Sequence, residues 1–142
     1  MAAEFTLGAG EERIEVRRLE FSTSAEKQKS AAELKSTISL KIGAFSGSLN
    51  AVFATQELVV LREQLVNSLA SGAGKVSFRN RTGDLDVEIE LNDQGGVIIS
   101  GKVQPHRLHQ ATLNFRFETD KSSLANTAQE LDDVLSSFTE RT

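Results

Sequence analysis

The strictest pattern in this sequence is an alternation of apolar and acidic residues over positions 84–91. The apolar members are Leu85, Val87, Ile89 and Leu91, and the acidic members are Asp84, Asp86, Glu88 and Glu90. Successive side chains of a β-strand point to opposite faces, so a period of two predicts a strand with one buried and one exposed face. The chain is therefore expected to fold around a β-sheet that has a solvated side.

Weaker alternations predict more strands on both sides of this segment. We expect strands near residues 5–7, 12–20, 36–44, 49–53, 76–78, 97–103 and 113–117. The alternation changes phase at Arg17–Arg18, which predicts a bulge or bend there. Between Ser36 and Phe53 the pattern fits one long bent strand or a tight hairpin, because Gly43 and Gly47 supply the bend. Short connections between the later strands favour antiparallel pairing.

Two segments carry apolar residues at helical spacing, and we expect helices over 55–70 and 121–138. Their apolar stripes are Leu58, Leu61, Leu65 and Leu69 in the first, and Leu124, Ala128, Leu131, Leu135 and Phe138 in the second. Thr55 and Asp120 are the expected N-caps, because their side-chain oxygens can accept a hydrogen bond from a free amide of the first turn.

These elements predict an α+β fold: a single, mostly antiparallel sheet of about six or seven strands with both helices on one face. The length favours a single domain over residues 1–142. The polar segment 22–35 is expected to be a loop or to carry a short helix near Ala31–Leu34. Residues 49–55 (LNAVFAT) and 113–119 (LNFRFET) form a weak repeat, and each precedes an expected helix. Duplication and convergence both explain it.

Composition argues against several classes of function. The formal net charge is -4, and nucleic-acid binders usually need a concentrated basic surface. The chain has no cysteine, which excludes disulfides and thiolate metal sites and fits a reducing cytoplasm. Neither an apolar signal segment nor a membrane-spanning run is present. We therefore expect a cytoplasmic protein that binds neither nucleic acid nor membrane.

No pattern of catalytic or metal-binding residues stands out. The two histidines, His106 and His109, share one loop, but a zinc site would need further ligands. The segment Gly72–Lys75 lacks the spacing of a phosphate-binding loop, and no nucleophile elbow occurs. Asn80–Thr82 matches a glycosylation sequon, which has no consequence in a cytoplasmic protein. The expectation is a protein that is not an enzyme and has no cofactor and no metal.

The acidic row on strand 84–91 has two interpretations. It can be an electronegative docking surface for a basic partner, whose association it would accelerate. It can also be a solvated sheet face, on which Lys75, Arg79 and Lys102 from neighbouring strands pair with the acids.

Residues 43–135 resemble a bacterial family, the WapI-type immunity proteins of polymorphic toxin systems. The resemblance rests on Gly43–Leu49 (GAFSGSL), Glu57–Leu58, the glycine-flanked strand Gly95–Gly101, and Leu113–Leu124, which matches most closely. Members of this family are small cytoplasmic proteins, many of them encoded near toxins. The resemblance implies a non-catalytic protein that neutralises a cognate toxin by occluding its active site.

If a toxin is bound, a nuclease toxin with a basic cleft would suit the acidic row. The partner-binding residues expected on this basis are Asp84, Asp86, Glu88 and Glu90, with His106 and Arg107 at the rim. The alternative is a small acidic secretion-type chaperone or adaptor that binds an extended partner segment at a sheet edge. A ligand-binding domain would need an apolar pocket. The exposed sheet face also allows a homodimer.

Overall fold

The chain forms two four-stranded antiparallel sheets and two helices in a computed structural model, which describes residues 3–21, 33–80, 83–92, 94–104 and 112–139. Sheet A contains β1 (Ala3–Ala9), β2 (Glu12–Phe21), β3 (Glu33–Ile42) and β4 (Phe45–Ala54), and α1 (Thr55–Ser71) follows it. Sheet B contains β5 (Gly74–Arg79), β6 (Leu85–Leu91), β7 (Gly96–Val103) and β8 (Leu113–Asp120), and α2 (Lys121–Thr139) follows it. Within each sheet the strands are ordered as in the sequence.

The prediction of a single sheet of six or seven strands is wrong, because β4 and β5 do not pair. Helix α1 lies between these strands in the sequence. The series of antiparallel neighbours that forms sheet A therefore ends at β4, and a second series, which forms sheet B, begins at β5. An alternating pattern shows that each strand buries one face, but it does not show what covers that face. Here the buried faces of the two sheets contribute to one hydrophobic core.

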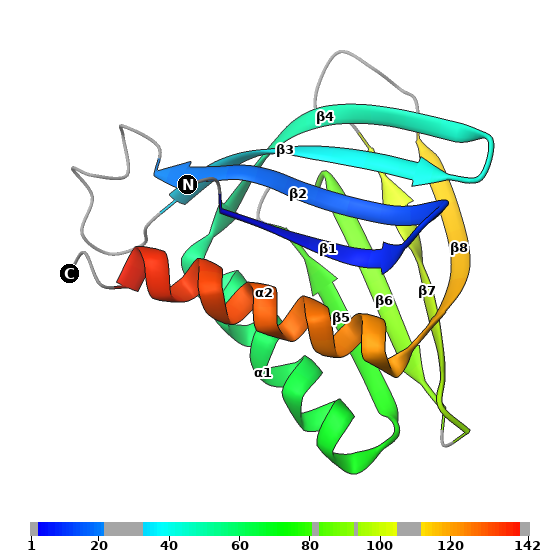
Figure 1. Cartoon of the computed structure of the whole chain (residues 1–142). Coiled ribbons are helices and arrows are strands. Elements are labelled where there is room, and N and C mark those ends of the chain that lie inside the picture. The colour runs from blue at the N-terminus through cyan, green and yellow to red at the C-terminus, as the bar shows by residue number, and fades with distance from the viewer. Residues whose placement is uncertain (1–2, 22–32, 81–82, 93, 105–111, 140–142) are drawn as a thin grey trace.

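The prediction that both helices lie on one face of one sheet is also wrong. Helix α1 packs on β5 of sheet B, α2 packs on β1 of sheet A, and the two helices pack on each other. An ion pair joins them, with Arg62 Nε 2.5 Å from Asp132 Oδ1. Each helix therefore leaves one sheet and packs against the first strand of the other (Figure 1).

Phenylalanine rings connect the two sheets inside the core. Phe53 of β4 stacks on Phe78 of β5, with ring centroids 5.9 Å apart, and meets Phe5 of β1 edge-on at 6.5 Å. At another point Gly8 allows a close approach, since a Cβ atom there would lie 2.7 Å from a ring carbon of Phe117 in β8. The sheets are thus in direct contact at more than one place.

Several local predictions are confirmed. The register of β2 against β3 shifts between Arg17 and Glu20, and Arg18 has a φ of 57°, so the predicted bulge is present. The segment 36–53 contains a tight hairpin rather than one bent strand, because β3 and β4 pair antiparallel from Glu33 to Ala54. The loop or short helix expected over 22–35 does not extend over residues 33–35, because these begin β3. Residues 22–32 lie outside the described residues.

Both helices begin within a residue of their predicted starts, but only one N-cap was predicted correctly. Asp120 caps α2: its Oδ1 accepts hydrogen bonds from Ser123 N at 2.9 Å and Ser122 Oγ at 2.8 Å. These bonds hold the pKa of Asp120 below its usual range. In α1 the N-cap is Ala54, not Thr55, and the Glu57 carboxylate accepts a hydrogen bond from Ala54 N at 2.8 Å.

Helix α2 covers the free edge of β1. Glu130 Oε1 accepts a hydrogen bond from Thr6 N at 2.9 Å, and Thr127 Oγ1 donates one to the Thr6 carbonyl. Unpaired backbone groups at a sheet edge otherwise invite association with another chain. The backbone N–H and C=O groups of Thr6 on this edge are therefore bonded within the molecule.

Candidate partner-binding surfaces

The acidic row predicted on strand 84–91 forms the centre of the outer face of sheet B. The four apolar residues of β6 are buried, whereas Asp86 is half-buried and Glu88 and Glu90 are exposed. β6 is an inner strand, paired with β5 on one side and β7 on the other. The three carboxylates therefore project from a backbone that is hydrogen-bonded along both edges, which holds them at fixed spacing.

Asp84 does not belong to this exposed row. It precedes β6, is only 3% exposed, and its carbonyl accepts a hydrogen bond from Gln104 N at 2.9 Å. The expectation that all four acids share one solvated face is therefore wrong for Asp84, because it lies before the first residue of β6 and is buried there. The other predicted contact residues, His106 and Arg107, lie outside the described residues.

Basic residues on the neighbouring strands flank the acidic row. Asp86 is in register with Arg79 on β5 and with Lys102 on β7. Lys75 Nζ lies 3.5 Å from Glu88 Oε2, and both side chains are about half exposed. The outer face of sheet B therefore carries mixed charge rather than a uniformly negative field. Exposed pairs of this kind contribute roughly 0–1 kcal/mol each.

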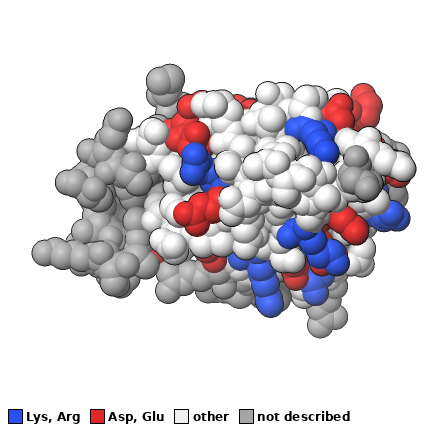
Figure 2. Space-filling model, turned by 90° about the horizontal axis from the view of Figure 1, so that it is seen from below, with Lys and Arg blue, Asp and Glu red and all other residues white. Residues whose placement is uncertain are grey.

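Mixed charge is also visible elsewhere on the surface. Figure 2 shows acidic and basic side chains interspersed among uncharged ones on the face seen from below. On β8, Arg116 is in register with Ser100 and Glu118 with Ile98, so both extend the charged face beyond the row that the sequence indicated. Arg116 and Glu118 were not singled out from the sequence because they have opposite charges and form no row of one sign.

A hollow of about 360 Å³ lies beside β8, lined by Glu12, Arg116, Phe117 and Glu118. Its lining residues come from the start of β2 in sheet A and from β8, an edge strand of sheet B. Three of its four lining residues are charged.

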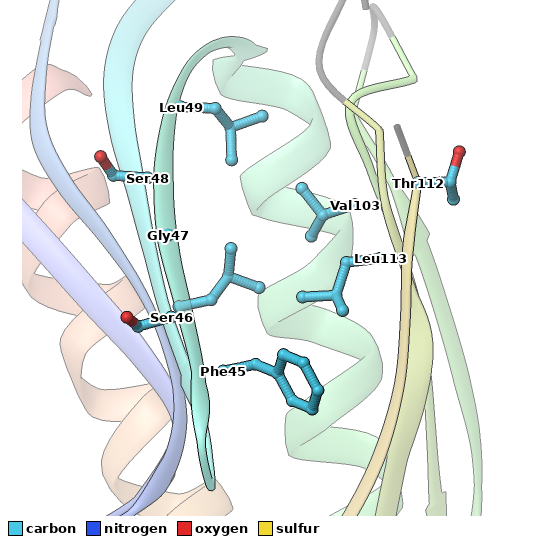
Figure 3. Close-up of a pocket in the computed structure, with 9 residues that line it drawn as sticks. Phe45, Ser46, Gly47, Ser48, Leu49, Val103, Thr112 and Leu113 are labelled. Carbon is cyan, nitrogen blue, oxygen red and sulfur yellow. The ribbon is translucent and has the colours of Figure 1, made fainter. Parts of the chain in front are cut away.

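A second surface, which the sequence did not indicate, is an apolar groove between the two sheets. It has a volume of about 290 Å³. Its lining consists of Leu40, Phe45, Ser46, Gly47, Ser48, Leu49, Val103, Thr112 and Leu113. In Figure 3 the side chains of Phe45 and Leu49 point across it towards Val103 and Leu113, and Ser46 and Ser48 point away. Phe45 is 65% exposed, more than the other large hydrophobic residues that the structure shows as exposed, Val60 and Val66, at 40% each.

Other kinds of site find no support in the part of the chain that the structure describes. No group of three or more His, Cys, Asp or Glu side chains there could hold a metal ion. Neither described helix is both long and apolar enough to cross a membrane.

The comparison with curated proteins gave no match. The model of a protein family described as the immunity protein WapI-like family matches residues 5–139. The match includes both sheets and both helices almost completely, and it confirms the resemblance found on the turn and core residues of the sequence. The chain therefore belongs to the immunity protein WapI-like family.

Proposed function

We propose that this protein binds a cognate bacterial toxin and neutralises it by covering the toxin's active site. Membership of the immunity protein family is the observation that carries this proposal. The protein contributes a stiff surface, since the acidic residues of the row stand on β6, a strand paired on both sides and backed by a shared core. A preorganised surface loses less conformational entropy when it binds.

The outer face of sheet B is the proposed contact surface, with Asp86, Glu88 and Glu90 at its centre. The flanking cations change what this face can recognise. Simple attraction by net negative charge would be weak here, because Arg79 and Lys102 flank Asp86. A partner with its own alternating charges would be oriented by the pattern, and mismatched partners would be rejected by like charges.

The experiment measures protection by the full-length chain against the toxin encoded in the neighbouring reading frame. Protection is read as growth of cells that express both proteins, and association is read as the rate of complex formation between purified proteins at low and high salt. Glu88→Lys and Asp86→Lys should slow association by at least about tenfold and abolish protection, because charge complementarity acts mainly on the association rate.

A matched control is available on sheet A. Glu20 of β2 lies 3.5 Å from Lys35 Nζ, the same separation as Glu88 from Lys75, and both acids are exposed. Glu20→Lys should leave protection and association unchanged. Equal losses from Glu20→Lys and Glu88→Lys, or no loss from either, would remove sheet B as the contact surface.

The activity of the bound toxin separates this function from that of a secretion-type chaperone. A toxin that is inactive in the purified complex supports inhibition by occlusion. A complex in which the toxin keeps full activity contradicts it and supports the chaperone or adaptor function.

A further inference from the structure

Strand β4 differs from the other three edge strands of the two sheets. The free edge of β1 is covered by α2 through Thr127 and Glu130. β5 carries Lys75 and Arg79 and packs against α1, and β8 carries Arg116, Glu118 and Asp120. β4 (FSGSLNAVFA) has no charged residue and no proline. Natural proteins usually protect an edge with charge, proline or a covering element, and the first half of β4 has none of these among the described residues.

The backbone of β4 offers hydrogen bonds along this edge. The Val52 carbonyl accepts a hydrogen bond from Asn80 Nδ2 at 3.0 Å, so it points away from β3. Backbone groups of alternate residues point to the same side of a strand. The N–H and C=O groups of Ser46, Ser48 and Asn50 therefore point to the free edge. The next group of this kind, the Val52 carbonyl, is not available because it is bonded to Asn80.

We propose that β4 pairs antiparallel with β4 of a second copy of this chain, so that two A sheets join into one continuous sheet. The pairing is centred on Ser48 facing Ser48 of the second copy. The proposal goes beyond toxin neutralisation and does not depend on it, because β4 lies in the sheet that does not carry the acidic row.

Complementarity of β4 with itself carries the proposal. In this register Ser46 lies opposite Asn50 of the second copy, which places hydrogen-bonding side chains opposite each other on the outer face. On the groove side, Phe45 lies opposite Ala51 and Leu49 lies opposite Gly47 of the second copy, so each large side chain meets a small one. No like charges face each other, because the strand has none.

The two neighbouring registers that also align the free backbone groups are less favourable. A pairing centred on Gly47 places Phe45 against Leu49, which sets two large side chains opposite each other. A pairing centred on Leu49 requires the backbone of Val52, whose carbonyl is already bonded to Asn80. The register centred on Ser48 uses the edge from Phe45 to Ala51 and stops before Val52. It also covers the exposed ring of Phe45.

The test is the mass of the full-length chain in solution, measured by analytical ultracentrifugation over a range of concentrations. The expected species is a dimer of twice the 15.4 kDa chain mass. Ser48→Lys should raise the dimer dissociation constant at least about tenfold, because the two new ammonium groups would face each other. A wild-type chain that stays monomeric at every soluble concentration overturns the proposal.

Mixing variants makes the test specific for this register. Ser48→Lys and Ser48→Glu should each dimerise more weakly than the wild type when alone and should form a tighter heterodimer when mixed, since Lys and Glu then face each other. A single chain carrying Ser46→Lys and Asn50→Glu should dimerise with itself for the same reason. If Ser48→Lys dimerises as well as the wild type, or if mixing restores nothing, β4 is not the interface.

Ser39→Lys is the matched control. Ser39 lies opposite Ser48 within sheet A, on the same outer face but one strand away from the edge. This variant should leave the dimer intact, with circular dichroism verifying the fold of every variant. Equal loss of dimer from Ser39→Lys and Ser48→Lys would point to association through the sheet face and contradict pairing at the edge.

Discussion

At the scale of single residues, Asn80 holds sheet A and sheet B together. It is 1% exposed, and its Nδ2 donates to the Val52 carbonyl of β4 while its Oδ1 accepts a hydrogen bond from Leu85 N at 3.0 Å. One amide side chain thus connects β4 to the start of β6. The sequence shows only that Asn80 begins a glycosylation sequon. Its structural role depends on a contact 28 positions away, which no local pattern reveals.

Replacing Asn80 with Asp tests this connection. The Nδ2 donor would become a carboxylate oxygen facing the Val52 carbonyl, so two acceptors would meet in a buried place. We expect the free energy of unfolding to fall by about 1–3 kcal/mol, measured by urea denaturation. Asn67→Asp on the exposed side of α1 adds the same charge and should change stability little. Equal effects of the two variants would mean that the Asn80 bonds contribute nothing.

At the scale of elements, the contact between α2 and β1 depends on the ionisation of Glu130. Burial raises the pKa of Glu130 above its ordinary 4.5, and the Glu4 and Asp133 carboxylates raise it further, while the hydrogen bond from Thr6 N lowers it. The folded protein therefore binds this proton more tightly than the unfolded chain does. The stabilisation from that proton is fully present below pH 4.5 and is lost as pH rises through the folded pKa.

Glu130→Gln removes this titration. The free energy of unfolding of the variant minus that of the wild type should become more positive between pH 4 and pH 7, because only the wild type loses the contribution of the Glu130 proton. Urea denaturation at both pH values measures it. Glu63→Gln, on the exposed side of α1, is the control for loss of one negative charge. A difference that is the same at both pH values would show that Glu130 does not couple pH to stability.

Elements were predicted best where the signal is local. The two helices start within a residue of their expected positions because an apolar stripe at helical spacing marks their length, and Asp120 marks the start of α2. The N-cap of α1 was missed because Glu57 bonds back to Ala54, which gives a cap without a polar residue at the cap position. Strand β3 was placed too late, since its first residues lie in a polar segment with little alternation.

At the scale of the whole molecule, the two sheets stabilise each other through one core. Phe53 is fully buried, and its ring contacts one ring from each sheet: Phe5 of β1 in sheet A and Phe78 of β5 in sheet B. Each sheet alone would expose one apolar face to water, so neither has a covered core without the other. We therefore expect the two sheets to unfold together.

Truncating Phe53 tests this cooperation. Phe53→Ala should lower the free energy of unfolding by about 3–5 kcal/mol, because it leaves a cavity between the sheets. Hydrogen exchange should show equal loss of protection for amides of inner strands in both sheets. Val60→Ala, at a position 40% exposed on α1, should change stability by less than about 0.5 kcal/mol. Loss of protection confined to sheet A would contradict a shared core.

The candidate surfaces were predictable to different degrees. The alternation on β6 places Asp86, Glu88 and Glu90 on one exposed face, because side-chain direction on a strand follows from position alone. Which cations lie beside these acids depends on the register of β6 with β5 and β7. The sequence suggested that Lys75, Arg79 and Lys102 could pair with the acids, but it left this open against a free docking surface. The burial of Asp84 was not predictable in this way, because the alternation groups it with the exposed acids although it lies before the start of β6.

The sequence by itself determined most of the strands to within a few residues, the two helices, most of the buried residues on each and the family, because these follow from periodicity, capping and short local motifs. Only the tertiary structure decided that the strands divide into two sheets, that each helix packs on the other sheet, and that the uncharged strand β4 lies at the edge of sheet A. The physical reason is that an apolar face must be covered, but many partners can cover it. The choice depends on the combined packing of segments far apart in the chain.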